Sequence, residues 1–537
     1  MRVLSTVLLV LGAVGCVLGT EVICYWASWT SYRTGHGKVT VDDLDPTKCT
    51  IYIYAFATLD ERTLTMQPFD IHLDIDQRGY ERFVALKERN PRLRVLLALG
   101  GYNDSGPKYS RMLASRERRN KFVRRAVALL RQYGFDGLDL DYEYPTAADK
   151  PHFAKLVAEL KRAFRPYDMW LSTATPATRE RIDEGFDVPA IASEIDMIHV
   201  MAYDFHGSWE STADHHSPLL PRASDNGRGF DVETTVHHWL RRGAPAAKLA
   251  LGVPLYGRSW TVPGPDKRPS VAAGTGPGRA GPYSREPGTL TYLEICEKIH
   301  DGWNAVQDPS GRAGPHAFSG DQWVGFDDPS TAARKTLFAL SLGLGGMMVW
   351  DVGSEDVRDV CGGGPWPMLT AINAYLELAG SATAVSPTQR PAVTARPTQV
   401  TTVVNTGAGA GRFSCPRDGV FADPADCTRF YVCSSERRSC PAGTAFSSRS
   451  GTCQRTVPEC PTVASAGPPA TTTTTTRRPA GRFTCPRPNG LYPDPYSCRR
   501  FFFCQNGKAE STACPANTGW DSQIGACNWL YNIDCQD

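Results

Sequence analysis

Short apolar runs separated by helical patterns fill the first two thirds of the chain. Eight runs have the apolar or β-branched character of buried strands. They lie at residues 22–26, 51–57, 95–101, 137–143, 170–175, 197–203, 249–256 and 347–351. Helical patterns lie between many of them. One apolar stripe follows i, i+4, i+7, i+8 and i+11 from Phe122 to Tyr133 and ends at Gly134, which predicts a helix that stops there.

Strands that alternate with helices in this way predict an α/β fold. Eight such strands over about 360 residues favour a (β/α)8 TIM barrel, and a doubly wound open sheet is the main rival. The interval between the seventh and eighth runs is long, and it is rich in glycine and proline with some β-like stretches. We expect it to hold a small α+β insertion at about 261–320. The barrel as a whole is predicted to span 21–380.

The composition changes after residue 380. Residues 381–411 are rich in Pro, Thr, Val and Ala, and residues 463–481 include the run Thr471–Thr476. Both segments are predicted to be linkers, either O-glycosylated stalks or merely disordered spacers. The segments that they flank, 412–462 and 482–537, repeat each other: GRFSCP at Gly411 matches GRFTCP at Gly481.

Each repeat carries six cysteines in a shared pattern. The third cysteine follows the second by six residues in both copies, and the fifth follows the fourth by thirteen. Such spacing predicts two small disulfide-rich β modules. Six cysteines allow 15 pairings, so the spacing does not fix the connectivity.

The N-terminus and the cysteine count both indicate secretion. Met1 and Arg2 precede an apolar run at 7–18 and then small residues, which predicts a signal peptide over 1–20. The alternatives are a membrane anchor, for which the run is short, and a lipoprotein signal ending at Cys16. Without Cys16, sixteen of the 17 cysteines remain, enough for eight disulfides in an extracellular protein.

The charge balance excludes two classes of partner. The chain has 58 basic and 56 acidic residues, a net charge of +2, and no long basic run. We therefore expect no nucleic-acid partner and no electrostatic docking to a membrane.

Three acids occupy one face of the fourth predicted strand. Side chains alternate along a strand, so Asp139, Asp141 and Glu143 share a face that excludes Tyr142. Carboxylates this close repel, so at least one must be protonated or hydrogen-bonded. A raised pKa on Glu143, at the carboxyl end of the strand, would suit a general acid at a barrel active site. Asp136 has the opposite parity, which indicates a structural role.

A metal site or a solvated edge strand would be the alternatives to catalysis. No His or Cys lies near the three acids in sequence, and an oxygen-only site would draw on more scattered ligands. We therefore predict no metal and no cofactor.

The segment DGLDLDYEYP (136–145) resembles the DGxDxDWEYP signature of family 18 chitinases. Further matching segments lie at 24–29, 54–57, 96–103, 201–210, 254–260, 321–328 and 345–350. The two repeats resemble peritrophin-type chitin-binding domains of animals. The resemblance implies a TIM barrel that binds chitin and chitooligosaccharides.

The resemblance also implies a mechanism in which the acetamido oxygen of the substrate is the nucleophile. Glu143 would protonate the leaving oxygen and later activate water. Asp141 would hold the acetamido N–H, Asp139 would share a proton with Asp141 from below, and Tyr203 would donate to the acetamido oxygen.

The resemblance further implies a cleft whose aromatic side chains stack on sugar faces. Trp350 would form the floor of the central subsite, with Trp29 and Trp209 extending the cleft. The expected substrate-binding residues are Tyr25, Trp29, Phe56, Gly100, Gly101, Tyr102, Asn103, Tyr144, Met201, Ala202, Asp204, Trp209, Tyr256, Arg258 and Trp350. The family usually has Trp where this chain has Tyr102 and Tyr142. Asn103 opens a glycosylation sequon that we expect to be unused.

Disulfide pairings follow from the resemblance alone. In the barrel they are Cys24–Cys49 and Cys296–Cys361. In the modules they are Cys415–Cys433, Cys427–Cys460, Cys440–Cys453, Cys485–Cys504, Cys498–Cys535 and Cys514–Cys527. Aromatic residues between these cysteines are candidate chitin contacts: Phe430, Tyr431, Phe501, Phe502, Phe503, Trp520 and Trp529.

The sequence thus predicts a secreted, monomeric endochitinase that cleaves β-1,4-linked N-acetylglucosamine polymer with retention of configuration. The alternatives are a catalytically weak or inactive, lectin-like chitin-binding protein, and a matrix protein that uses only its C-terminal modules.

Overall fold

The computed structural model describes residues 20–383 and short segments beyond them, at 420–422, 429–432, 436–439, 445–447, 452–454, 484, 490–494, 497–505, 508–513, 518–521 and 526–529. The predicted signal peptide and linkers lie almost entirely outside the described residues. So do the side chains of all twelve module cysteines and of Phe430, Tyr431, Phe501, Phe503, Trp520 and Trp529.

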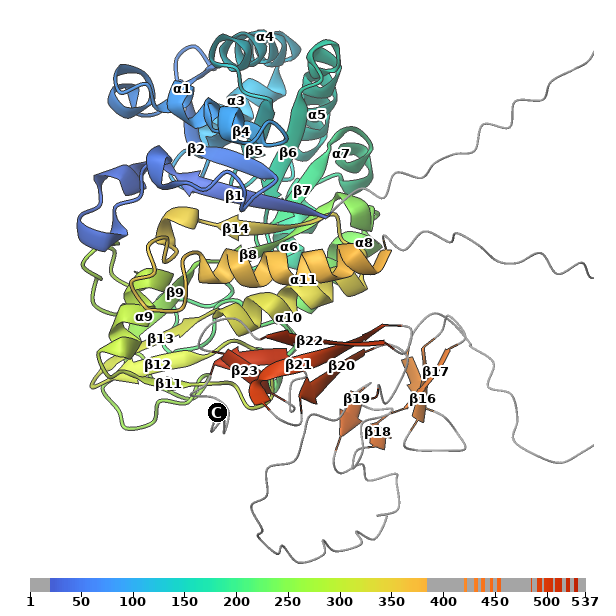
Figure 1. Ribbon diagram of the computed structural model, residues 1–537. Coiled ribbons are helices and arrows are strands. Elements are labelled where there is room, and N and C mark those ends of the chain that lie inside the picture. The colour runs from blue at the N-terminus through green and yellow to red at the C-terminus, as the bar shows by residue number, and fades with distance from the viewer. Residues whose placement is uncertain are drawn as a thin grey trace, which may run out of the picture. The chain divides into compact units, whose positions relative to one another are not determined.

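Eight parallel strands close into a barrel (Figure 1). They are β1 (Glu21–Ala27), β2 (Ile51–Leu59), β4 (Arg94–Gly100), β5 (Gly137–Asp141), β6 (Trp170–Thr175), β7 (Met197–Val200), β8 (Leu249–Pro254) and β14 (Gly346–Trp350). Their order is β1-β14-β8-β7-β6-β5-β4-β2, and pairing of β1 with β2 closes the ring. The predicted TIM barrel is confirmed, and closure excludes the doubly wound sheet. A short strand, β3 (Met66–Pro68), pairs antiparallel with β2.

Helices surround the barrel. They are α1 (Gly79–Val84), α2 (Leu86–Arg89), α3 (Pro107–Ala114), α4 (Arg116–Tyr133), α5 (Lys150–Phe164), α6 (Arg179–Gly185), α7 (Val188–Glu194), α8 (Val232–Arg241), α10 (Pro329–Ser341) and α11 (Pro367–Thr383). Short 3-10 turns lie at Ser28–Tyr32, Gly35–Gly37, Val41–Asp43, Arg165–Tyr167, Ala223–Asp225, Ala246–Lys248 and Val352–Ser354, and a π turn at His72–Asp76.

The predicted helix stripe corresponds to α4. Phe122, Ala126 and Leu130 are buried against the barrel, as their spacing predicts. Ser115 caps the first turn by accepting a hydrogen bond from the backbone N–H of Arg118. Gly134 ends the helix at φ +80°, a left-handed conformation that suits glycine.

An antiparallel sheet is inserted between β8 and β14. Its strands are β9 (Tyr256–Thr261), β10 (Thr289–Thr291), β11 (Asn304–Val306), β12 (His316–Ser319) and β13 (Gln322–Phe326), in the order β10-β9-β13-β12-β11, with helix α9 (Tyr292–His300). This confirms the α+β insertion. The predicted run 249–256 contains all of β8 and the first residue of β9, because the chain leaves the barrel at Leu255 and enters the inserted sheet at Tyr256.

Two further runs were predicted too long. β5 ends at Asp141, so Glu143 follows the strand rather than forming its last position. β7 ends at Val200, where the backbone N–H of Ala202 turns back to the carbonyl of Val200 at 2.8 Å. The segments after β5 and β7 therefore leave the sheet at the carboxyl end of the barrel, where loops carry the active sites of this fold.

Disulfides Cys24–Cys49 and Cys296–Cys361 are present in the structure, and the second joins α9 of the insertion to the loop after β14. Among the described residues no helix is both long and apolar enough to cross a membrane.

The two C-terminal modules share one strand layout. The first has β15 (Val420–Ala422), β16 (Arg429–Val432) and β17 (Glu436–Ser439) in one antiparallel sheet, and β18 (Ala445–Ser447) with β19 (Thr452–Gln454) in another. The second has β20 (Gly490–Asp494), β21 (Ser497–Gln505) and β22 (Lys508–Ala513), then β23 (Thr518–Asp521) with β24 (Ala526–Trp529). The small β modules predicted from the repeat are confirmed.

Candidate active site

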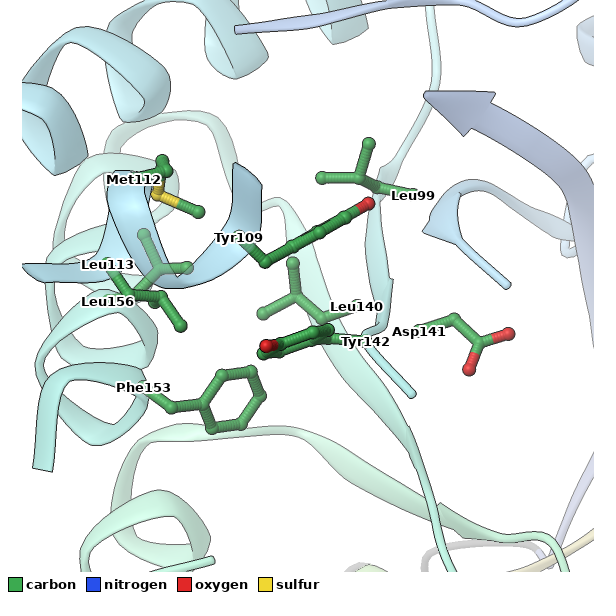
Figure 2. A pocket seen from close by; sticks show the side chains of 9 residues that line it. All are labelled: Leu99, Tyr109, Met112, Leu113, Leu140, Asp141, Tyr142, Phe153 and Leu156. Carbon is green, nitrogen blue, oxygen red and sulfur yellow. The ribbon is translucent and has the colours of Figure 1, made fainter. Parts of the chain in front are cut away.

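The three acids follow one another from the barrel interior toward its carboxyl end. Asp139 is fully buried, Asp141 is 4% exposed, and Glu143 is half-buried just beyond β5. Figure 2 shows the Asp141 carboxylate pointing away from a small cavity lined by the side chains of Leu140 and Tyr142. The alternation that the sequence predicts along this strand is therefore present.

Asp139 is held at the bottom of the site by hydroxyl donors. Tyr25 donates to its Oδ2 and Ser172 to its Oδ1, both at 2.7 Å. His199 Nδ1 lies 2.7 Å from the same tyrosine hydroxyl and 3.3 Å from Asp139 Oδ1. These side chains are buried, so the network fixes Asp139 in one orientation.

Asp141 lies between two other acids. Burial, followed by the charges of Glu143 and Asp139, raises its pKa well above the usual range. Its Oδ1 is buried, and no group in the described part of the chain hydrogen-bonds to it. A buried carboxyl oxygen without a partner is costly unless a ligand supplies one, so Asp141 is available to bind a polar group of a substrate.

Burial is the main reason that Glu143 has a raised pKa, of about 7. A hydrogen bond with Tyr144 opposes the shift, and the charge of Asp204 adds to it. Glu143 therefore carries a proton at slightly acid pH, which is the state that a general acid needs.

Asp204 stays ionised beside Glu143. Burial opposes its ionisation, but the Arg258 guanidinium and then His216 outweigh burial and hold the Asp204 pKa well below its usual range. Arg258 donates to it from Nε at 2.7 Å and from Nη2 at 2.6 Å, and His216 Nδ1 lies 3.2 Å away. Two neighbouring carboxyls with pKa values this far apart are typical of acid-catalytic sites.

A row of aromatic rings lies beside the acids. The Phe56 ring stacks on Trp350 with centroids 5.6 Å apart, and Trp29 lies 6.0 Å from Phe56 and 6.1 Å from Trp350. Trp209 is 61% exposed and lies under the Arg258 guanidinium, 5.5 Å from it. Exposed flat rings next to polar groups suit the faces and rims of sugars.

Comparison with known proteins identifies the family. The profile of Glycosyl hydrolases family 18 matches residues 21–356, more than half of the chain. The chain belongs to glycosyl hydrolase family 18. Residues 415–460 and 485–535 match the Chitin binding Peritrophin-A domain, so this family 18 enzyme carries two such domains.

Three similar proteins illustrate the range of the family. Probable chitinase 10 of Drosophila melanogaster is 42% identical over 369 residues, which are 66% of this chain and 16% of that protein. The chain therefore spans about a sixth of that relative. The structure of catalytic domain 2 of the Ostrinia furnacalis Group II chitinase is 42% identical with a TM-score of 0.65, covering 67% of this chain and 96% of that one. Human YKL-39, described as a pseudo-chitinase with retained chitooligosaccharide binding, is 32% identical with a TM-score of 0.63, covering 67% and 100%.

The family 18 barrel brings most of the predicted residues together, at different depths. Tyr25 is 1% exposed under Trp350 and contacts Asp139, so its position suits a residue that orients the acid more than one that lines an open cleft. Burial raises the pKa of Tyr203 well above its usual value, so this tyrosine remains a hydrogen-bond donor. Tyr256 is also buried. Tyr144 and Met201 are partly buried, and Ala202 is fully buried.

Gly100 and Gly101 lie where a side chain would clash with its neighbours. Gly101 has φ +86°, and a Cβ there would lie 2.6 Å from the Phe56 ring. A Cβ on Gly100 would lie 2.0 Å from the carbonyl oxygen of Asp141. The two glycines thus allow close packing behind the aromatic row and the acids. Tyr102 and Asn103, which follow, are exposed, and Tyr102 is 79% exposed.

Tyr142 lies behind the barrel wall, as its parity predicts. Its ring stacks on Tyr109 at 4.7 Å, and its hydroxyl donates to Asp149 at 3.2 Å. Figure 2 shows these rings beside a small cavity. Its volume is about 10 Å³. The effect of tyrosine here on the acids is therefore indirect. Asp136 accepts from the backbone N–H of Val95 at 2.8 Å, in keeping with a structural role.

Sequence reasoning missed Ser172, His199 and His216. The signal for His199 was a polar residue on the inward parity of an otherwise apolar barrel strand. Ser172 lies in a strand that also carries Thr173 and Thr175, so its polarity did not mark it out. His216 lies in a loop, and nothing in its local sequence indicates the contact with Asp204.

Two groups of described residues have metal-ligand chemistry. The first is Cys296, Asp356 and Cys361, and its two sulfur atoms are joined in a disulfide. The second is already neutralised by a side chain. His206, Asp214 and Asp225 place ligand atoms within 4.8 Å of one another. The Arg222 guanidinium occupies the same place, 2.5 Å from Asp214 Oδ1 and 3.0 Å from Asp225 Oδ1. A cation is thus supplied by the chain itself.

Proposed function

We propose that this family 18 enzyme is a secreted endochitinase, which hydrolyses internal β-1,4 linkages of N-acetylglucosamine polymer with retention of configuration. The observation that carries the proposal is the acid row: a protonatable Glu143 with a pKa of about 7 at the carboxyl end of the barrel, and two buried acids, Asp139 and Asp141, deeper in the barrel. The names of the similar chitinases support the substrate class.

The proposed reaction uses the acetamido group of the substrate as nucleophile. Glu143 gives its proton to the glycosidic oxygen as the C1–O bond breaks, while the acetamido oxygen attacks C1 and forms an oxazolinium ion. The carboxylate of Glu143 then takes a proton from water, which attacks C1 and opens the ring. Retaining enzymes of this kind need no carboxylate nucleophile, and a tethered nucleophile has a high effective concentration.

The other residues would position the acetamido group of the substrate and stabilise the oxazolinium ion. Asp141, whose Oδ1 lacks a partner in the described chain, would bind the acetamido N–H and balance the oxazolinium charge. Asp139, fixed by Tyr25 and Ser172, would accept the proton that Asp141 gives up. Tyr203 would donate to the acetamido oxygen. Trp350, Trp29 and Trp209 would stack on the sugars.

The two C-terminal modules would hold the enzyme on insoluble chitin. Tethering raises the effective substrate concentration without a new contact in the catalytic site. Secretion would place the enzyme with this polymer and suits a chain rich in disulfides.

The fold alone does not establish hydrolysis, because human YKL-39 shares it and is described as a pseudo-chitinase. The test is digestion of hexa-N-acetylchitohexaose by the full chain. Internal cleavage yields dimer, trimer and tetramer together from the first minutes. Binding without products would leave a chitin-binding protein, and initial release of dimer and tetramer without trimer would contradict endo action.

The pH dependence follows from Glu143. Its pKa is raised to about 7, and the proposed acid must be protonated. We therefore expect kcat/KM to fall about tenfold per pH unit above pH 7, because the acid form is lost there. Stopped assays from pH 4 to 9, with the melting temperature followed in parallel, measure this limb. Constant kcat/KM up to pH 9 in a folded enzyme would contradict the role of Glu143.

A variant of Asp204 tests one cause of the raised pKa of Glu143. The charge of Asp204 contributes to the raised pKa of Glu143. Asp204→Asn should therefore move the midpoint of the alkaline limb to lower pH, whatever its effect on the maximal rate.

A further inference from the structure

The outer side of α4 carries six cations. Figure 1 shows this helix on the outer wall of the barrel, beside α5. Its exposed basic residues, which we call the cationic face, are Arg116, Arg118, Lys121, Arg124, Arg125 and Arg131. In sequence they are separated by acidic, polar and apolar residues, so no long basic run marks them. The helix gathers them on one side over about 22 Å, at 1.5 Å per residue.

These charges are not neutralised within the described part of the chain. None of the six lies within 4 Å of a carboxylate there, whereas the buried Arg119 of the same helix pairs with Glu159 at 2.9 Å. Arg118 and Lys121 donate only to backbone carbonyls, of Arg111 and Thr63. The one acid exposed on the helix is Glu117.

The arrangement is unfavourable for the isolated helix. Lys121 lies three residues before Arg124 and four before Arg125, and like charges at these spacings repel. Elsewhere on the surface, exposed arginines such as Arg78 and Arg268 pair with acids close by in sequence. A concentrated, unpaired cationic face attracts polyanions and speeds their association.

The composition of the face favours one kind of polyanion. Its remaining exposed residues are Glu117, Ala128 and Gln132, so it offers no large apolar side chain to insert into a bilayer. The cationic face has no exposed aromatic residue of its own, and the neighbouring Tyr167 ring has the Arg131 guanidinium over it at 4.4 Å, so the face lacks the row of free rings on which single-stranded bases stack. Arginine forks suit sulfate and carboxylate groups.

We propose that the cationic face of α4 binds a linear acidic polysaccharide that carries sulfate or carboxylate groups. The site is separate from the catalytic residues and does not rest on hydrolysis. It would anchor the enzyme to an acidic component of a polysaccharide matrix.

The test is affinity of the full chain for heparin at 0.15 M NaCl, with polygalacturonate as a carboxylate-only probe. K121E/R124E/R125E should weaken the heparin Kd by at least ~30-fold and flatten its salt dependence, because fewer counterions are released. The matched control R78E/R268E/R279E changes the net charge equally at residues that are 74%, 75% and 71% exposed, and should stay within about threefold.

Each result of the heparin-binding test either supports or overturns the proposal. Loss confined to the α4 variant supports the site, and binding of polygalacturonate as well as heparin extends it to carboxylated chains. Equal loss in the control, or no heparin binding by the wild type, overturns the proposal. So does binding of a DNA duplex or of anionic lipid vesicles at least as tight as that of heparin. The neutral variant K121Q/R124Q/R125Q, with circular dichroism melting, keeps the result readable if the charge reversal disturbs folding.

Discussion

Replacing Glu143 with glutamine should lower kcat/KM for chitooligosaccharide by about 10³-fold or more, because general acid–base catalysis contributes about 10²–10⁴-fold. Glutamine keeps the size of the side chain and cannot give up a proton to the leaving oxygen. The substrate Kd should change little, because the aromatic row and Asp141 remain. Initial rates on a soluble oligomer, together with calorimetric binding, measure both quantities.

The control for this variant is Glu117→Gln, an identical exchange at an exposed position of α4. It should keep wild-type turnover. If Glu143→Gln hydrolyses the oligomer at more than about a tenth of the wild-type rate, Glu143 is not the acid, since even a weak general acid contributes about 10²-fold.

The second large effect is expected for Asp141→Asn. An asparagine fits the same space but can neither carry a negative charge nor share a proton with Asp139. The positive charge that develops on the oxazolinium ion would lose its counter-charge in a buried site. We expect kcat to fall about 10²–10³-fold with a small change in KM, as for other preorganised electrostatic groups.

Asp301→Asn is the matched control, because the Asp301 side chain is 79% exposed and far from the acid row in sequence. Kinetics over a full substrate range separate kcat from KM. An increase in KM at unchanged kcat would assign Asp141 to substrate binding alone and contradict its proposed part in the reaction.

The fold and the acid row could be predicted because both depend on local periodicity. Apolar runs marked all eight barrel strands, and the alternation of side chains placed Asp139 and Asp141 on the inner side and Tyr142 on the outer side. Strand ends were less accurate: the run 249–256 continues through the turn at Leu255, because residues on both sides of the turn are apolar and buried.

The contacts that orient the acids or shift their pKa values could not be predicted from periodicity. Tyr25 meets Asp139 across 114 residues, and His216 meets Asp204 through a loop. Periodicity carries no information about which distant loops meet. The same reason explains Arg258, whose place in the cleft was implied by the family resemblance, while its contact with Asp204 and its effect on the Asp204 pKa came from the structure.

The most direct test of the account is the anomeric form of the first product. Proton NMR during hydrolysis of hexa-N-acetylchitohexaose by the wild-type chain records the anomers before they equilibrate. Attack by the substrate acetamide followed by water predicts that the β-anomer appears first. Appearance of the α-anomer first, or binding of the oligomer without any product, would contradict the account.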